Sequence, residues 1–426
     1  MNESRPNRKL LTVIGPGILV AATGVGAGDL SMGALTGSQL GLVILWAAVV
    51  GAFLKYLLSE GLTRWQLATG DTLLEGAADH LGPVVRYGFL AYVVLWSFGV
   101  GAALMSACGV TAHAIFPLGS ELNPDRDKIV YGILHSLVAV VMVRIGGYRL
   151  FEKVMSVCIA IMFFTVVATA IALGPAWGEV LSGICWPQIP NLGGDGLQWT
   201  VGLMGGVGGT VTILCYGYWI REEGRSGVED LKLCRLDLAV GYGMTALFGI
   251  GMVIIGTQIS AEGRGSRFVV DLADALETQL GAGGLVAKWA FLIGAWGAVF
   301  SSLLGVWQSI PYLFADFWGL TFGRTEEERK AAVETNSPAY RGYLYAIATV
   351  PMLGLMGNFA SVQKWNAILG AFIIPMLAGV LLILNGREKW VGRDQRNSPL
   401  TVLLLTATLL FFLTAFWFEV QKKLGG

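Results

Sequence analysis

The chain has 426 residues, of which 54% are hydrophobic and only 14% are charged, and its formal net charge is zero. Charged residues make up about a quarter of an average soluble domain, so the composition excludes a soluble fold of this size. The balanced charge, without a basic cluster, also excludes nucleic acid as a partner. The composition indicates an integral membrane protein in contact with the lipid bilayer.

Eleven segments are apolar enough to form transmembrane helices, each of which needs about 20 mostly apolar residues. In chain order they are 11–36, 42–62, 84–116, 129–143, 153–174, 197–220, 237–258, 286–318, 341–357, 364–385 and 399–419. The loops between them are too short for a soluble domain. We therefore expect an all-α integral membrane fold, with one transmembrane transporter domain over residues 1–426.

The distribution of Lys and Arg predicts the orientation, since basic residues concentrate on the cytoplasmic side of a membrane. With the N-terminus in the cytoplasm, the cytoplasmic segments hold 20 of the chain's 29 Lys and Arg residues. An odd number of helices then places the C-terminus outside. We expect a monomeric, multi-pass protein of a bacterial-type inner (plasma) membrane.

Glycine runs interrupt the first and sixth helices, and polar residues follow each run. These residues are Gly24, Gly26, Gly28 and Asp29 in helix 1, and Gly208, Gly209, Thr210 and Thr212 in helix 6. Glycine costs about 1 kcal/mol relative to alanine inside a helix, so the runs favour unwinding, although glycines also allow close helix packing. Breaks at matching positions are typical of inverted repeats, here helices 1–5 and 6–10, and mark a transporter's substrate site.

Unwound backbone offers two kinds of ligand within a membrane. Its carbonyl groups suit cations, and amides at a helix N-terminus suit anions. Asp29 either caps the restarting helix or acts in the site as an ionisable group, and Thr210 has the same capping option. The sequence leaves these alternatives open.

The sequence GPGILVAATGVGAGDL, followed by TGSQLG, resembles helix 1 of the Nramp family of divalent-metal transporters. SEGLTRWQLATGDTLLEG and GGTV at 208–211 resemble its helices 2 and 6. The resemblance implies a secondary active transporter with an eleven-helix variant of the leucine-transporter fold. The family's Asp-Pro-Gly-Asn becomes Gly26-Ala27-Gly28-Asp29, and its Met-Pro-His becomes Thr212-Ile213-Leu214. The family's usual metal ligands are therefore missing.

Without those ligands we expect a small inorganic anion, bicarbonate by size and charge, because the amides of Gly208 and Gly209 can approach an oxyanion closely. Ser301 and Ser302 in helix 8 resemble the hydroxyl pair that leucine-transporter-fold proteins supply to a sodium ion. Carbonyls near Ala22 and Val25 would complete that site. We therefore expect sodium symport, with bound sodium and no other cofactor.

Three alternatives compete with this expectation. The first is a divalent-metal transporter, for manganese or magnesium, whose site has drifted to hard-ion ligands such as Asp29. The second is a membrane enzyme, which the absence of HExxH, GxSxG and P-loop motifs disfavours. The third is a receptor or scaffold that has lost transport. We expect a transporter and not an enzyme.

Overall fold

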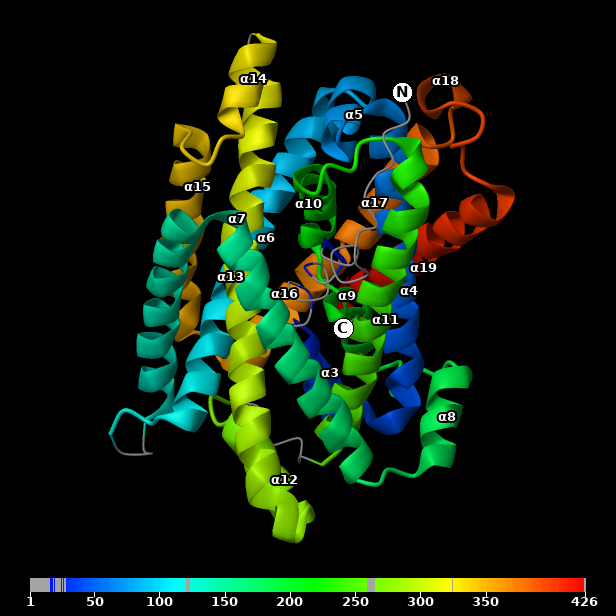
Figure 1. Ribbon diagram of the computed structural model, residues 1–426. Helices are drawn as coiled ribbons and strands as arrows, with labels where there is room; N and C mark the ends of the chain where they lie inside the picture. The colour runs from blue at the N-terminus through cyan, green and yellow to red at the C-terminus, as the bar shows by residue number, and fades with distance from the viewer. Residues whose placement is uncertain are drawn as a thin grey trace.

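The computed structural model describes residues 16, 17, 19, 24, 26, 28–119, 123–258, 265–323 and 325–424, and within these ranges all regular structure is helical (Figure 1). The first half contains η1 (Gly28–Met32), α3 (Gly33–Leu40), η2 (Gly41–Ile44), α4 (Leu45–Thr69), α5 (Leu73–His80), α6 (Pro83–Ile115), α7 (Pro124–Ala172) and α8 (Trp177–Cys185). The expected all-α class is confirmed.

The second half begins with a helix in pieces, α9 (Gly196–Gly206), η3 (Val211–Cys215) and α10 (Tyr216–Glu222). It continues with η4 (Val228–Asp230), α11 (Leu231–Gly256), α12 (Phe268–Gln279), η5 (Gly281–Gly283), α13 (Gly284–Phe322) and α14 (Glu326–Ala332). The last elements are α15 (Pro338–Thr349), η6 (Val350–Met356), α16 (Phe359–Ala371), α17 (Ile373–Leu384), α18 (Glu388–Val391) and α19 (Pro399–Leu424).

By length and apolar composition, 8 helices in the described ranges could cross a membrane, or 9 if a bent pair after residue 160 counts as one span. This number of spans is below the expected eleven partly because residues 28–69 are counted as one span. They contain two of the expected helices, which η2 separates. The segment 338–356, which changes from α-helix to 3-10 helix, is not among the counted spans. Eleven spans remain a prediction, and the multi-pass architecture is plain.

α7 corresponds to two of the expected helices. Its 49 residues would extend about 70 Å as a straight helix, more than twice the thickness of a bilayer core. Figure 1 shows the chain reversing direction within α7, so that its two halves run antiparallel. The expected segments 129–143 and 153–174 match these halves.

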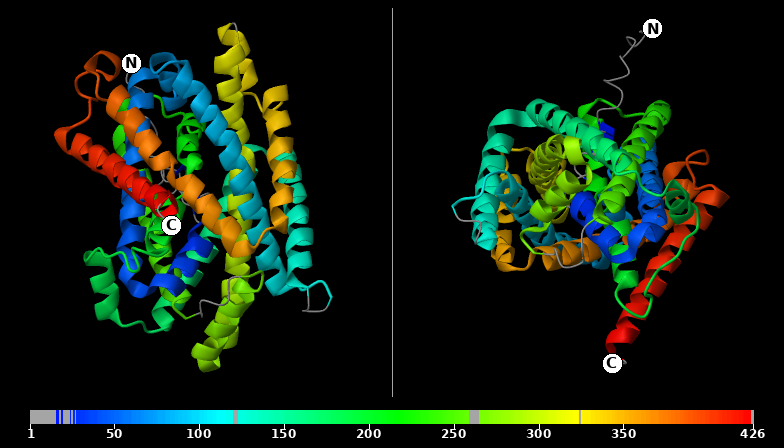
Figure 2. Two further views of the ribbon diagram at one scale, coloured as in Figure 1. Left: turned by 180° about the vertical axis from the view of Figure 1, so that it is seen from behind. Right: turned by 90° about the horizontal axis from the view of Figure 1, so that it is seen from below.

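The periphery of the bundle is apolar, as a lipid-facing surface requires. α19 lies at one edge and packs against α17 (Figure 2). Its Phe416, Trp417 and Phe418 are between 52% and 61% exposed. In water such a surface would aggregate, whereas in a bilayer it contacts lipid tails.

Small residues bring the inner helices close together. A Cβ atom on Gly37 of α3 would lie 2.2 Å from the carbonyl oxygen of Val253 in α11, and one on Gly33 would lie 2.7 Å from Cβ of Met252. Such contacts leave no space for a larger side chain and are typical of helix interfaces in membranes. They hold α3, the second half of helix 1, against α11.

Candidate functional site

Helix 6 is interrupted at the predicted glycines. α9 ends at Gly206 and η3 begins at Val211. Between them Gly208 and Gly209 have φ angles of +79° and +82°, in the left-handed region that glycine enters without a steric penalty. The predicted break in helix 6 is confirmed, and its physical cause is this pair of glycines.

Helix 1 is interrupted at the matching place. The amide of Gly26 donates to the carbonyl of Gly24 at 2.8 Å, which closes a three-residue turn in place of a helical bond. The next turn, Gly28–Met32, is a π-helix. Single π-turns are rare and occur frequently at functional sites. The predicted break in helix 1 is therefore confirmed as well.

The two breaks touch each other through their backbones. A Cβ on Gly24 would lie 2.5 Å from the amide nitrogen of Gly209, and one on Gly28 would lie 3.2 Å from the carbonyl oxygen of Gly206. The glycines thus serve both purposes that the sequence left open, since they permit the breaks and also allow them to approach. Irregular backbone from both repeats meets at one place inside the bundle.

Asp29 reaches from helix 1 into the break of helix 6. Its side chain is fully buried, and both carboxylate oxygens accept from the amide of Gly208, at 3.3 and 3.2 Å. The residue before α3 is Met32, which makes no side-chain capping bond. The capping role proposed for Asp29 is wrong, because its carboxylate bonds to a residue 179 positions away.

Lys55 on α4 is the charged residue that the sequence analysis missed. It is fully buried, and its ammonium donates to the carbonyl of Gly205 at 2.6 Å and to that of Val207. These carbonyls belong to the end of α9, where backbone oxygens lack helical partners and carry partial negative charge. A lone lysine within an apolar helix is a functional candidate, and this signal could have identified it.

The two predicted threonines lie in different surroundings. A Cβ on Gly370 of α16 would lie 2.4 Å from Cγ2 of Thr210, so Thr210 packs against α16. It makes no capping bond at the start of η3, so that option is wrong. The hydroxyl of Thr212 faces the break, since a Cβ on Gly209 would lie 2.7 Å from its Oγ1.

Helix 8 of the prediction is α13, and one of its serines lies beside the break in helix 1. A Cβ on Gly26 would lie 2.0 Å from Oγ of Ser302. Ser301 donates to the carbonyl of Ala298 in its own helix at 2.8 Å. Ala22 and Val25 lie outside the described residues. The sodium site therefore remains a prediction, with one of its serines next to a break.

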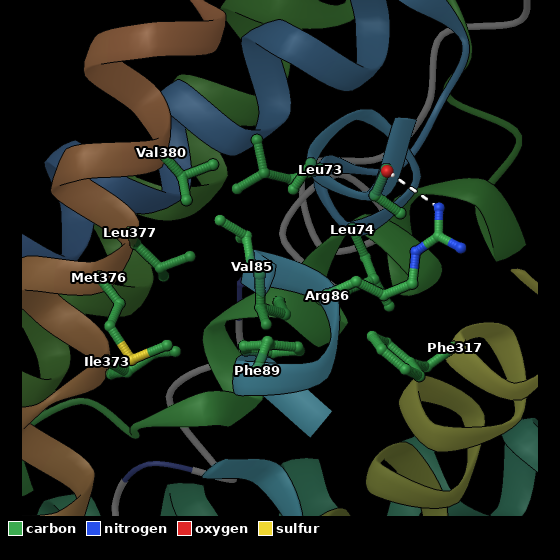
Figure 3. A pocket seen from close by; sticks show the side chains of 13 residues that line it. Leu73, Leu74, Val85, Arg86, Phe89, Phe317, Ile373, Met376, Leu377 and Val380 are labelled. Atoms are coloured by element: carbon green, nitrogen blue, oxygen red, sulfur yellow. Dashed lines mark hydrogen bonds between the residues drawn. The ribbon is translucent and has the colours of Figure 1, made fainter. Parts of the chain in front are cut away.

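Leu214 occupies the position of the family's histidine and lines a small apolar pocket of about 50 Å³ (Figure 3). The pocket lies between α5, α6, α13 and α17, where Leu73, Phe89 and Leu377 face one another. Its one charged lining residue, Arg86, donates to a backbone carbonyl of α5 at 3.0 Å. This pocket offers an ion no polar ligand.

A second buried charge cluster joins the ends of helices 1, 6 and 7. Asp237 of α11 accepts from the amide of Gly17 at 2.8 Å, from Tyr216 Oη at 2.9 Å and from Arg225 at 3.0 Å. Asp237 and Arg225 are at most 1% exposed. The carboxylate uses both oxygens for short bonds, so the cluster ties the helix ends together.

Side chains do not form a transition-metal cage anywhere in the described part of the chain. No group of three or more His, Cys, Asp or Glu residues there is placed to hold a metal ion. The polar groups at the breaks are one carboxylate, one ammonium, hydroxyls and backbone carbonyls. These polar groups are hard ligands or charges, and the Met32 side chain at the end of η1 packs beside them against Gly202 and Gly206 of α9.

The fold and these breaks define a class. Two interrupted helices that meet inside a multi-pass helical bundle, with ionisable side chains at the junction, are the architecture of a secondary transporter.

Comparisons with known proteins give the family. The model of the natural resistance-associated macrophage protein-like (Nramp) family matches residues 17–421, and the chain belongs to this family of membrane transporters. The metal transporter Nramp2 of Populus trichocarpa is 25% identical over 95% of this chain and 75% of its own. The divalent metal cation transporter MntH of Levilactobacillus brevis is 22% identical, over 89% of this chain and 90% of its own.

A solved structure has the same fold. A mutant of the Eremococcus coleocola manganese transporter superposes with a TM-score of 0.69 at 15% identity, covering 99% of this chain and 93% of that one. The predicted Nramp resemblance and the leucine-transporter type of fold are thereby confirmed. The chain is an Nramp-type secondary transporter.

Proposed function

We propose that this protein transports a divalent cation, bound as a hard ion where the two helix breaks meet. One observation carries the proposal: the backbone carbonyls of Gly205 and Val207 already hold a positive group, the Lys55 ammonium, which also interacts electrostatically with Asp29. Groups that stabilise a buried ammonium suit a metal cation too. The names of the relatives, which are metal, divalent-metal and manganese transporters, support the same substrate class.

The ligand set favours magnesium and manganese over softer metals. Carboxylate, carbonyl and hydroxyl oxygens are the donors that hard cations prefer, and thioether and imidazole suit softer ions. Magnesium in particular keeps several of its waters, so it does not need a full cage of side chains. Asp29, the two carbonyls and the Thr212 hydroxyl provide enough oxygen for such a partly hydrated ion.

Bicarbonate, the substrate expected from sequence, is the second candidate. Lys55 favours it, because a buried ammonium can serve as counter-charge to an anion. Against it, the Gly208 amide that was to bind the oxyanion donates to Asp29, whose own charge repels anions. The relatives' names also give an anion no support. The divalent cation is therefore the stronger proposal.

The remaining expectations extend the proposal. Sodium is the proposed coupling ion, supported by Ser302 beside the break in helix 1. The excess of Lys and Arg in alternate loops supports a cytoplasmic N-terminus and an outer C-terminus. The relatives that are bacterial transporters support the plasma membrane of a bacterial-type cell. A monomer with one transmembrane domain completes the proposed assembly.

Purified protein in liposomes tests the substrate. Manganese uptake is followed with an enclosed fluorescent dye and bicarbonate uptake with an internal pH indicator, each with and without a sodium gradient. Asp29→Asn keeps the side chain's shape and removes its charge. Asp271→Asn, on the short helix α12, removes a partly exposed carboxylate away from the breaks and is the matched control.

The proposal predicts manganese uptake by the wild type and by Asp271→Asn. In Asp29→Asn uptake should fall at least about tenfold, since even a hydrogen bond to a charged group contributes about 1.5–3 kcal/mol. Bicarbonate uptake without manganese uptake would replace the first candidate by the second. Manganese uptake that is unaffected by Asp29→Asn would show that the cation does not bind at Asp29, where the two breaks meet.

A further inference from the structure

Lys55 lies among the proposed ligands, and its ammonium occupies the carbonyls that the proposed function assigns to the transported cation. We infer that its ammonium is a tethered competitor, which occupies the place of the transported cation and restricts the site to divalent ions. The inference rests on the proposed function, because it assumes that a cation binds at the breaks. It assigns Lys55 as the residue that determines the ion's charge.

The geometry places Lys55 where an incoming cation must bind. Its ammonium contacts the carbonyl oxygens of Gly205 and Val207, the same oxygens that would ligate the ion. The side chain is fully buried, so these contacts replace water as its hydrogen-bond partners. Two positive charges cannot share these carbonyls within an apolar interior, because their repulsion is screened very little there. The ion and the ammonium therefore exclude each other.

The charge balance gives the same result. One acidic side chain, Asp29, and one basic side chain, Lys55, are buried at the junction of the breaks, and the charges of their ionised forms sum to zero. Adding a divalent ion without moving Lys55 would bury two net positive charges, which a membrane interior strongly disfavours. Moving the ammonium away lowers that charge. The lysine side chain has a flexible four-carbon stem that allows such a movement.

The tether explains why divalent ions are selected. The ammonium is fixed to α4, so its effective concentration at the carbonyls far exceeds that of a dissolved ion. A sodium or potassium ion has the same charge as the ammonium and gains no electrostatic advantage over it. A divalent ion interacts about twice as strongly with the carboxylate of Asp29. Only the divalent ion is therefore expected to displace Lys55.

Lys128 on α7 is a matched control. It is 1% exposed, and its ammonium donates to a carboxylate, Asp125 Oδ1, at 3.1 Å and to the carbonyl of Gly357 at 2.9 Å. It thus resembles Lys55 in burial and in donating to a backbone carbonyl, but its contacts are with Asp125 and Gly357 and not with the breaks. Its replacement measures the general effect of removing a buried lysine.

The experiment uses the full chain with Lys55→Met, Lys55→Gln, Lys55→Arg and Lys128→Met. The half-saturating manganese concentration is measured by thermal stabilisation of the protein in detergent and by uptake into liposomes, each with and without potassium. In Lys55→Met and Lys55→Gln we expect half-saturation at a concentration at least about tenfold lower, and new inhibition by potassium. Lys55→Arg and Lys128→Met should resemble the wild type in both respects.

Each other result has a definite meaning. Unchanged manganese half-saturation in folded Lys55→Met and Lys55→Gln would overturn the inference and leave the proposed function intact. Failure of both variants to fold would also overturn it, because Lys55 would then be structural. Inhibition of Lys55→Arg by potassium would show that the shape of the side chain, and not its positive charge, excludes monovalent ions. That result would also overturn the inference. A wild type that neither binds nor carries manganese would instead refute the proposed function.

Discussion

Two buried pairs of opposite charge in this protein are built differently. Asp237 receives three short hydrogen bonds, one of them from its partner Arg225, and both of its oxygens are used. Asp29 receives one long, shared bond from Gly208, and no direct ion pair joins it to Lys55, although the structure describes both residues. In the first pair both carboxylate oxygens of Asp237 are bonded. The second keeps acceptor capacity, since a carboxylate can accept about four bonds.

This difference separates a structural role from an exchangeable one. A well-bonded buried ion pair holds its helices in place. Removing one partner leaves the other charge buried and uncompensated, which is strongly destabilising. A carboxylate with unused lone pairs, beside backbone carbonyls that hold a lysine, can accept another cation. We therefore interpret the Asp237 cluster as a clamp between helix ends and the Asp29 region as the place where ions bind.

The largest expected effect is on stability, at the Asp237 cluster. Arg225→Leu should lower the free energy of unfolding by about 3–5 kcal/mol, because Asp237 is left buried without its partner. Chemical denaturation in detergent measures this. Arg267→Leu is the control, since its 3.9 Å pair with Asp271 is partly exposed and contributes under about 1 kcal/mol. Equal losses in both variants would show that Asp237 is no clamp.

The next largest effect tests whether transport depends on the left-handed backbone conformation at the break in helix 6. Gly209→Ala places a side chain at a φ of +82° and within 2.7 Å of the Thr212 hydroxyl. Gly224→Ala has a similar φ, +69°, and open space around it. Each should lose about 1–2 kcal/mol of stability. Liposome uptake should fall at least about tenfold in Gly209→Ala alone, and equal uptake in the two variants would argue against the site.

A smaller effect separates the two threonines of helix 6. Thr212→Val removes a hydroxyl at the break, and Thr210→Val removes one packed against α16. A hydrogen-bonding group contributes about 1 kcal/mol, which corresponds to about fivefold in affinity. The manganese concentration for half-maximal uptake should rise about fivefold in Thr212→Val and stay unchanged in Thr210→Val. The reverse pattern would move the site toward α16.

The smallest effect is a pH dependence outside the membrane-spanning helices. A hydrogen bond from Lys364 lowers the pKa of Asp195 below its ordinary value of 3.8. The folded carboxyl thus holds its proton less tightly than the unfolded one, so its stabilisation is complete above pH 3.8 and is lost as the pH falls below that value. Asp195 is 58% exposed, so the effect should stay under about 1 kcal/mol. The melting temperatures of Asp195→Asn and the wild type are compared at pH 7 and pH 3. They should differ at pH 7 and become equal at pH 3, and a difference that persists at pH 3 would exclude this linkage.

Sequence reasoning succeeded where the cause was local. The breaks follow from glycines that favour unwinding within a few residues, so Gly208 and Gly209 could be identified without a structure. It failed where a residue's role depends on a distant partner. Asp29 and Gly208, which are hydrogen-bonded, are 179 positions apart in the sequence. Lys55 and Gly205 are 150 positions apart. Neither the register of α4 against α9 nor the rotation of helix 1 can be read from spacing.

The central claim, that the junction of the breaks binds a cation, is tested most directly by the charge that moves when ligand is added. Protein in liposomes adsorbed on a solid-supported electrode is exposed by rapid solution exchange to manganese or to bicarbonate, for the wild type and for Asp29→Asn. We predict an inward positive displacement with manganese in the wild type, none in Asp29→Asn, and none with bicarbonate. A displacement with bicarbonate alone, or an equal manganese signal in Asp29→Asn, would contradict the claim.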